Sequence, residues 1–157
     1  MPFPEPGDVA PDFEAVSQTG QTIRLRDYRG RPVALYAYPK DDTPGCTAQA
    51  CNLRDHTEAL DAAGIAVLGV SPDGEASHEA FAGRYALPFP LLADPDRAIL
   101  TAYGAWGEKA FYGKVSLGVK RSTFLIGPDG RIVHVFKQPK TDRHAEEILA
   151  VWHKAQS

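Results

Sequence analysis

The sequence predicts an α/β fold in which helices flank a central mixed β-sheet, and two patterns support this prediction. Residues 33–38 and 65–70 are apolar runs rich in strand formers, and a helical segment follows each of them. This β-α-β-α alternation is typical of parallel strands joined by right-handed crossover helices. Residues 122–126 and 131–136 flank the tight turn at residues 127–130, which predicts an antiparallel hairpin in the same sheet.

The N-terminal part of the chain predicts a strand extension to that sheet. The first 20 residues are rich in proline, so we expect them to run over the surface. Residues 22–25 alternate polar and apolar side chains, as a short half-buried strand does. The buried strand at residues 33–38 must end at Pro39, because proline has no N–H for the strand ladder.

A long helix is expected over residues 44–63. This segment is dominated by helix formers, and its alanines and leucines form an apolar face. Thr43 is a suitable N-cap, Pro44 suits the first helical turn, and Gly64 suits the C-terminal end.

The remaining elements follow the same reasoning. We expect a helix over residues 75–85, a short strand at residues 91–92 and a helix over residues 96–103. A glycine-rich aromatic loop with Trp106, Phe111 and Tyr112 should come next, and a final amphipathic helix over residues 142–152. With 157 residues and no linker, the chain is expected to form a single domain over residues 1–157.

Composition excludes several classes of partner. The net charge is −3, so the chain has no excess of lysine and arginine to neutralise phosphates, and nucleic acid is not an expected partner. No run of about 18 apolar residues predicts a membrane span, and the N-terminus lacks the apolar core of a secretory signal. We therefore expect a reducing, cytoplasmic compartment.

The two cysteines, Cys46 and Cys51, are the only pair in the chain and are the main functional signal. Cys46 lies in the first turn of the predicted helix, where unpaired N–H groups and the helix dipole favour a thiolate. Cys51 lies five residues later, so an intact helix separates the two Cα atoms by about 8.6 Å. A disulfide needs less than about 7 Å, and therefore the first turns must unwind before the pair can bond.

Other interpretations of the pair stay open at this point. Free cysteines are often small buried hydrophobes with no chemical role. A zinc site needs four ligands, and His56 alone does not complete one, so no metal is expected. A CxxC thiol exchanger is disfavoured because four residues, not two, separate the cysteines.

Residues 38–47, YPKDDTPGCT, with Cys51 downstream, resemble the active-site signature of the peroxiredoxins, and specifically the peroxiredoxin Q or bacterioferritin comigratory protein subfamily. Further matches, which extend the resemblance over nearly the whole chain, are GVSPD at residues 69–73, LPFPLLAD at 87–94, YGAWGEK at 103–109 and KRSTFLI at 120–126. The resemblance implies a thioredoxin-like fold and a thiol peroxidase that needs no metal or organic cofactor.

By the same resemblance, Cys46 is the peroxidatic residue, and Cys51 resolves its sulfenic acid through an intramolecular disulfide. Thr43 and Arg121 complete the catalytic group, and Pro39, Pro44 and Gly45 shape the substrate pocket. The expected substrates are hydrogen peroxide and alkyl hydroperoxides, and the expected reductant is thioredoxin or a similar dithiol protein. We expect a monomer, with a dimer as the alternative.

Alternatives accompany these assignments. Thr43 could be only an N-cap, and Arg121 only a solvated residue at the start of a strand. Many relatives carry Glu where this chain has Gln49, and an amide is a weaker acceptor than a carboxylate for an arginine. At the level of the whole protein, the alternatives are a noncatalytic thioredoxin-like module that binds a partner in a redox-dependent way and a general dithiol-disulfide exchanger.

Overall fold

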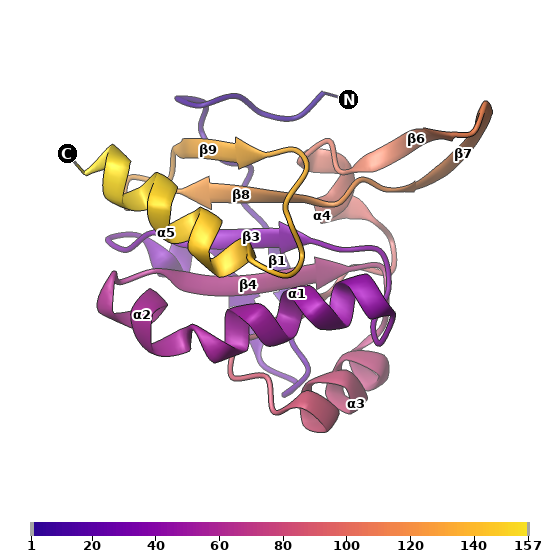
Figure 1. Ribbon diagram of the computed structural model, residues 1–157, viewed down its shortest axis with the longest axis horizontal. Coiled ribbons are helices and arrows are strands. Elements are labelled where there is room, and N and C mark those ends of the chain that lie inside the picture. Colours follow the sequence, from indigo (N-terminus) through magenta and orange to yellow (C-terminus); the bar gives the residue numbers. More distant parts are fainter. Residues whose placement is uncertain (1, 157) are drawn as a thin grey trace.

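A five-stranded mixed sheet forms the centre of the computed structural model, which describes residues 2–156 (Figure 1). The strand order is β5-β4-β3-β8-β9. Strand β3 pairs in parallel with β4, and β4 in parallel with β5, whereas β3–β8 and β8–β9 are antiparallel. This arrangement confirms the predicted mixed sheet. Its strands are β3 (Val33–Ala37), β4 (Ala66–Ser71), β5 (Leu91–Ala93), β8 (Ser122–Ile126) and β9 (Ile132–Phe136).

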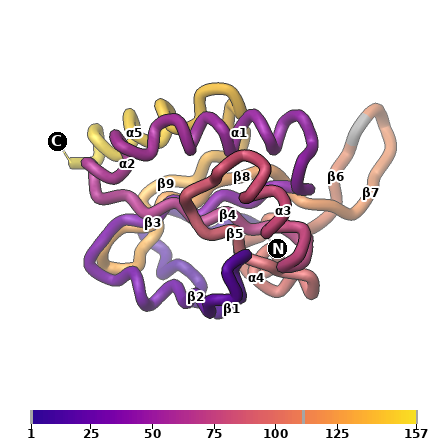
Figure 2. Tube along the Cα trace, turned by 90° about the horizontal axis from the view of Figure 1, so that it is seen from below, coloured from indigo at the N-terminus to yellow at the C-terminus, as the bar shows by residue number. Residues whose placement is uncertain are grey.

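Alternate side chains of the sheet enter two different cores, because successive residues of a strand point to opposite faces. On one face Ala34 and Tyr36 join the apolar sides of the helices, while on the other Val33 and Leu35 join the N-terminal segment. Figure 2 shows α1 and α5 on one side of the sheet and β1, β2 and α4 on the other. The helices are α1 (Pro44–Asp55), α2 (Thr57–Ala62), α3 (Glu75–Tyr85), α4 (Ala98–Ala102) and α5 (His144–Ala155).

The predicted N-terminal strand extension is confirmed as a separate two-stranded sheet. Strand β1 (Glu14–Val16) pairs antiparallel with β2 (Thr22–Arg24), and the short 3-10 helix η1 (Leu25–Tyr28) follows. Ala15, Ile23 and Leu25 are buried in the core on this face of the main sheet. The extension therefore covers the face that α1 and α5 leave open.

The prediction of one helix over residues 44–63 is wrong, because the helix breaks at His56 into α1 and α2. Side chains compete here with the backbone for helical carbonyls. His56 Nδ1 bonds the carbonyl of Asn52 at 2.8 Å, and the Thr57 hydroxyl donates to the carbonyl of Arg54 at 2.7 Å. Gly64 does follow the second helix in a left-handed conformation with φ +77°, as expected.

The expected aromatic loop is instead a β-hairpin, which projects from the body of the protein (Figures 1 and 2). It consists of β6 (Trp106–Phe111) and β7 (Lys114–Val119). Tyr112 and Gly113 form its tip with φ values of 51° and 76°, which is the sign that a two-residue hairpin turn of type I′ needs. The sequence lacks the usual Asn-Gly or Asp-Gly signal because a tyrosine occupies the first left-handed position.

The helix expected over residues 96–103 is shorter than predicted. Arg97 is left-handed with φ 60°, and the Asp94 carboxylate accepts hydrogen bonds from the N–H groups of Ile99 and Leu100, so α4 begins only at Ala98. Within residues 2–156, no helix has the length and apolar character that crossing a membrane requires.

Candidate active site

Cys46 is the third residue of α1 and lies in its first turn, as predicted. Thr43 has an extended backbone (φ −95°, ψ 155°), and its carbonyl accepts the N–H of Thr47 at 2.8 Å, which starts the helix. The Cys46 side chain is 1% exposed and belongs to the core on the helical face. Its sulfur is thus held at the positive end of the helix dipole and away from bulk water.

Arg121 reaches this sulfur from the residue just before β8. Its Nη2 donates to Cys46 Sγ at 3.3 Å, and its Nη1 donates to Gln49 Oε1 at 2.7 Å. The guanidinium also lies against Gly45, where a Cβ atom would be 3.2 Å from Arg121 Nη2. The fixed cation beside the sulfur favours the thiolate, because arginine does not lose its proton in proteins.

Gln49 orients Arg121 through a neutral amide, which is a weaker acceptor than a carboxylate. The side chain is 0% exposed, and its oxygen accepts from Arg121 as described above. Among the residues that the structure describes, Gln49 Nε2 has no hydrogen-bond partner. The amide therefore holds the arginine without adding a negative charge beside the Cys46 sulfur.

Thr43 lies at the start of α1, where the sequence left its role open. Its backbone occupies the N-cap position, but its side chain makes no capping hydrogen bond. Instead, the hydroxyl donates to the carbonyl of Lys40 at 2.8 Å. Because that bond uses the hydroxyl proton, the oxygen lone pairs remain available to accept a hydrogen bond.

Cys51 lies in the same unbroken helix, and both thiols are free. Directly after it, Asn52 ties α1 to the start of α5. Asn52 Oδ1 accepts the N–H of Ala145 at 2.7 Å, and Nδ2 donates to the carbonyl of Asp142 at 3.1 Å and to Glu146 Oε1 at 3.0 Å. The end of α1 is therefore anchored by side-chain hydrogen bonds, whereas the turns that carry both cysteines are held by burial and by Arg121.

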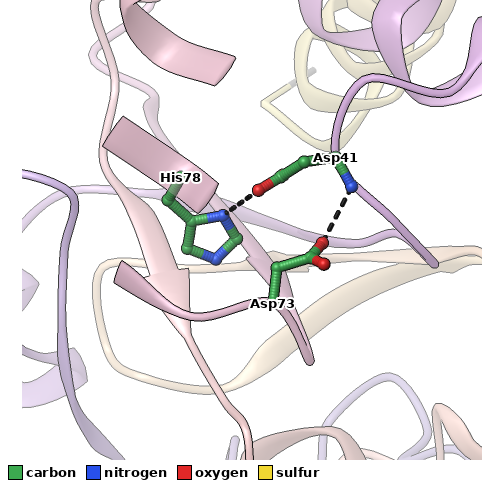
Figure 3. Close-up of side chains that lie close together, drawn as sticks. All are labelled: Asp41, Asp73 and His78. Atoms are coloured by element: carbon green, nitrogen blue, oxygen red, sulfur yellow. Dashed lines mark hydrogen bonds and ion pairs between the residues drawn. The ribbon is translucent and has the colours of Figure 1, made fainter. Parts of the chain in front are cut away.

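Sequence reasoning missed a buried polar cluster that holds the loop in front of α1 (Figure 3). Asp41 Oδ2 lies 2.7 Å from His78 Nδ1, and the Asp41 N–H donates to Asp73 Oδ2 at 2.8 Å. Ligand atoms of these three residues lie within 4.8 Å of one another, but each side chain is already hydrogen-bonded within the protein. No spacing in the sequence links these residues, which come from the loop before α1, the loop after β4 and α3.

Two tyrosines of β3 and its following loop form a rigid wall in the core that contains Cys46. Tyr36 and Tyr38 stack with ring centroids 5.3 Å apart, and the Tyr36 ring lies directly over Gly69. Burial raises the pKa of Tyr36 well above its usual range, and the nearby negative charge of Cys46 raises it further. Tyr36 is therefore neutral at physiological pH.

The aromatic residues of the β6–β7 hairpin have separate environments. Tyr112 is 91% exposed at the hairpin tip, and Trp106 packs under the Arg97 guanidinium at 4.6 Å. The side chain of Phe111 lies outside the described part of the structure. Pro39 is half-buried and Pro44 is exposed, so their role in shaping a substrate pocket stays a prediction.

Comparison with protein families and curated proteins gives a consistent assignment. Residues 6–135 match the AhpC/TSA family. The chain is 46% identical over 143 residues to Peroxiredoxin Bcp of Escherichia coli K12, and this match covers 91% of the chain and 92% of the relative. It is 41% identical over 145 residues to Peroxiredoxin Bcp of Bacillus subtilis, covering 92% of each.

Solved structures agree with this assignment across the whole chain. A cysteine-to-serine variant of Xylella fastidiosa PrxQ superposes with a TM-score of 0.92 at 32% identity, covering 100% of both chains. Xanthomonas campestris peroxiredoxin Q superposes with a TM-score of 0.87 at 36% identity, covering 92% of each chain. Both matches confirm the thioredoxin-like fold that the resemblance implied. The chain belongs to the AhpC/TSA family, as a thiol-dependent peroxidase of the Bcp/PrxQ group of peroxiredoxins.

Proposed function

We propose that Cys46 is the peroxidatic residue of this enzyme and that hydrogen peroxide and alkyl hydroperoxides are its substrates. The observation that carries this assignment is the 3.3 Å contact from Arg121 Nη2 to Cys46 Sγ at the N-terminus of α1. Membership of the peroxiredoxins supports it, and a structure of the Xanthomonas campestris relative was determined in connection with alkyl peroxide reduction.

The reaction follows from the groups around the sulfur. The Cys46 thiolate attacks one peroxide oxygen, an S–O bond forms as the O–O bond breaks, and the departing oxygen takes up a proton. Sulfur loses two electrons and the peroxide gains them, which leaves a sulfenic acid on Cys46. Arg121 opposes the negative charge that builds on the departing oxygen, and the Thr43 oxygen accepts a hydrogen bond from the peroxide O–H.

Cys51 is the proposed resolving residue. Its thiolate attacks Cys46 Sγ, so that an S–S bond forms as the S–O bond breaks, and the departing hydroxide takes up the proton that the Cys51 thiol released and leaves as water. Because an intact helix keeps the two Cα atoms about 8.6 Å apart, the turns of α1 between them must open for this step. A dithiol protein such as thioredoxin then returns both thiols by exchange. This cycle fits the reducing cytoplasm, which remains the expected compartment.

Stopped-flow measurement of peroxide consumption tests the assignment. We expect Cys46→Ser to abolish consumption, whereas Cys51→Ser, the matched control, should still consume one equivalent of peroxide and then stop. Mass spectrometry of the wild type after one equivalent should show the loss of two hydrogens within one chain. Equal rates for Cys46→Ser and the wild type would refute the proposal.

The two other functions considered from the sequence predict different results. In a noncatalytic binding module, Cys46 would form a sulfenic acid no faster than a free thiol does, as measured by chemical trapping. A general dithiol exchanger would reduce the disulfides of insulin and leave peroxide unconsumed. Membership of a peroxidase family argues against both.

A further inference from the structure

The loop that precedes Cys46 is held by a buried ion pair. Asp41 lies in this loop, five residues before Cys46, and its side chain is 4% exposed. His78, on α3, is 0% exposed. Two polar side chains that are removed from water in this way depend on each other, because no water replaces the partner that leaves.

Hydrogen bonds hold both ring nitrogens of His78 in place. His78 Nε2 faces the carbonyl oxygen of Leu92 at 2.9 Å, and a carbonyl only accepts, so Nε2 donates to it. Nδ1 faces Asp41 Oδ2 at 2.7 Å. Burial opposes the ionisation of Asp41, but hydrogen bonds from His78 and Tyr38 and the positive charge of His78 lower the pKa of this carboxyl.

Further donors complete the shell around Asp41. The Tyr38 hydroxyl donates to Oδ1 at 2.6 Å and the Ser77 hydroxyl to Oδ2 at 2.8 Å, while Asp73 holds the Asp41 N–H. All ligand atoms that Asp41 and His78 could offer are thus engaged within the protein. The cluster is an anchor that ties the loop to α3 and β5.

The neighbouring residue provides a natural comparison. Asp42 also binds α3, through Arg84 Nη1 at 2.8 Å, but the Asp42 side chain is 41% exposed and the Arg84 side chain 65%. Surface ion pairs contribute little, whereas removing one partner of a buried pair leaves an uncompensated charge. Asp42 is left-handed with φ 59°, so the chain changes direction immediately after the buried anchor.

We propose that the Asp41–His78 pair holds the loop directly before α1 in place while the first turns of α1 open. The pair thereby sets how readily Cys46 moves from its folded site to Cys51. The inference rests on the proposed function, because opening matters only if the two cysteines form a disulfide. Opening that reached Asp41 would leave the buried His78 Nδ1 without its hydrogen-bond partner, so opening stops at Asp42. Asn52 limits the opening at the downstream end.

The device has a measurable consequence, because the sulfenic acid on Cys46 has two fates. In the folded site a second peroxide oxidises it to the sulfinic acid, with an S–O bond gained as a second O–O bond breaks. In the opened segment Cys51 resolves it. A tenfold rise in a small opened fraction makes resolution about tenfold faster while the folded fraction hardly changes.

The test compares a neutral replacement of the pair with a matched surface control. In Asp41→Asn/His78→Asn both partners become uncharged amides, so no buried charge is left unpaired. We titrate each protein with hydrogen peroxide in the presence of dithiothreitol and measure by mass spectrometry the peroxide concentration at which half of Cys46 is sulfinic. We expect that concentration to rise about tenfold, and the rate constant of Cys46 oxidation to fall less than about twofold.

Two more variants keep the test decisive. Ser77→Ala removes one donor from Asp41 and keeps both members of the pair, so it should fold even if the double variant does not. Its half-oxidation concentration should lie between those of the wild type and the double variant. Arg84→Gln breaks the exposed pair on the same helix and should match the wild type. The inference is overturned if Ser77→Ala and the double variant match the wild type, or if Arg84→Gln shifts as far as they do.

Failure of the proposed function has a different signature. Wild-type protein that forms neither a sulfenic acid nor a disulfide at Cys46 would refute the peroxidatic assignment itself. Wild-type protein that forms both, with a half-oxidation concentration that does not respond to the pair, would refute only the inference about Asp41 and His78.

Discussion

Replacing Asn52 with alanine should destabilise the protein by an amount that the structure allows us to work out. The change removes the acceptor that caps α5 at Ala145 N–H, worth about 1 kcal/mol, and two exposed donor bonds to Asp142 and Glu146. We expect a loss of about 2 kcal/mol in the free energy of unfolding. For a chain of this size the melting temperature should fall by about 4–8 °C.

The assay is thermal and urea unfolding followed by circular dichroism, on both the reduced protein and the protein oxidised to the Cys46–Cys51 disulfide. Asn52→Asp is the control, because it keeps the acceptor for the Ala145 N–H; any loss that it shows comes from the two donor bonds and from the like charge of Glu146. If opening stops before Asn52, the alanine variant loses the same free energy in both redox forms. A loss confined to the reduced form would show that α1 melts past Asn52 and would refute the reasoning.

Three further predictions concern close approaches and pH. Gly45→Ala places a methyl group 3.2 Å from Arg121 Nη2, so the rate constant of peroxide reduction in stopped flow should fall several-fold while the melting temperature stays the same or rises, since alanine favours the helix by roughly 0.5–1 kcal/mol. Gly69→Ala puts a Cβ 2.9 Å from the Tyr36 ring, and overpacking of this kind should cost about 1–3 kcal/mol in urea unfolding. Burial lowers the pKa of His144 below 6.5, so near that pH the unfolded chain binds a proton that the folded protein does not. The free energy of unfolding should therefore fall as the pH drops below about 6.5. A His144→Gln variant should show a smaller fall over the same pH range.

Elements with strong local signals were predictable. The buried strands at residues 33–38 and 65–70 and the hairpin around residues 127–130 are present as β3, β4, β8 and β9, because their apolar runs and turn residues favour one structure only. The hairpin of β6 and β7 was missed although Val115, Leu117 and Val119 alternate along β7, because Val115 and Leu117 are exposed and a tyrosine adopts the left-handed conformation at a tip without the usual turn residues.

The site divides in the same way. The position of Cys46 at a helix N-terminus follows from Thr43, Pro44 and the strand before them. The structure has Thr43 at the N-cap, Pro44 as the first residue of α1 and Cys46 in its first turn. The contact of Arg121 with Cys46 joins residues 75 positions apart, so only the family resemblance could suggest it. The pairing of Asp41 with His78 had no signal at all, since it depends on how α3 packs beside the loop.

The anchored end of α1 also bears on how the enzyme returns to its starting state after each cycle. Beginning a helix in water is unfavourable by a factor of roughly a thousand, whereas extending an existing one adds a hydrogen bond for each residue that is fixed. If residues 52–55 stay helical on α5, reduction of the disulfide leaves a template on which the opened turns regrow by extension alone. Extension takes on the order of nanoseconds per residue, so recovery of the folded site should be limited by exchange with the reductant and not by folding.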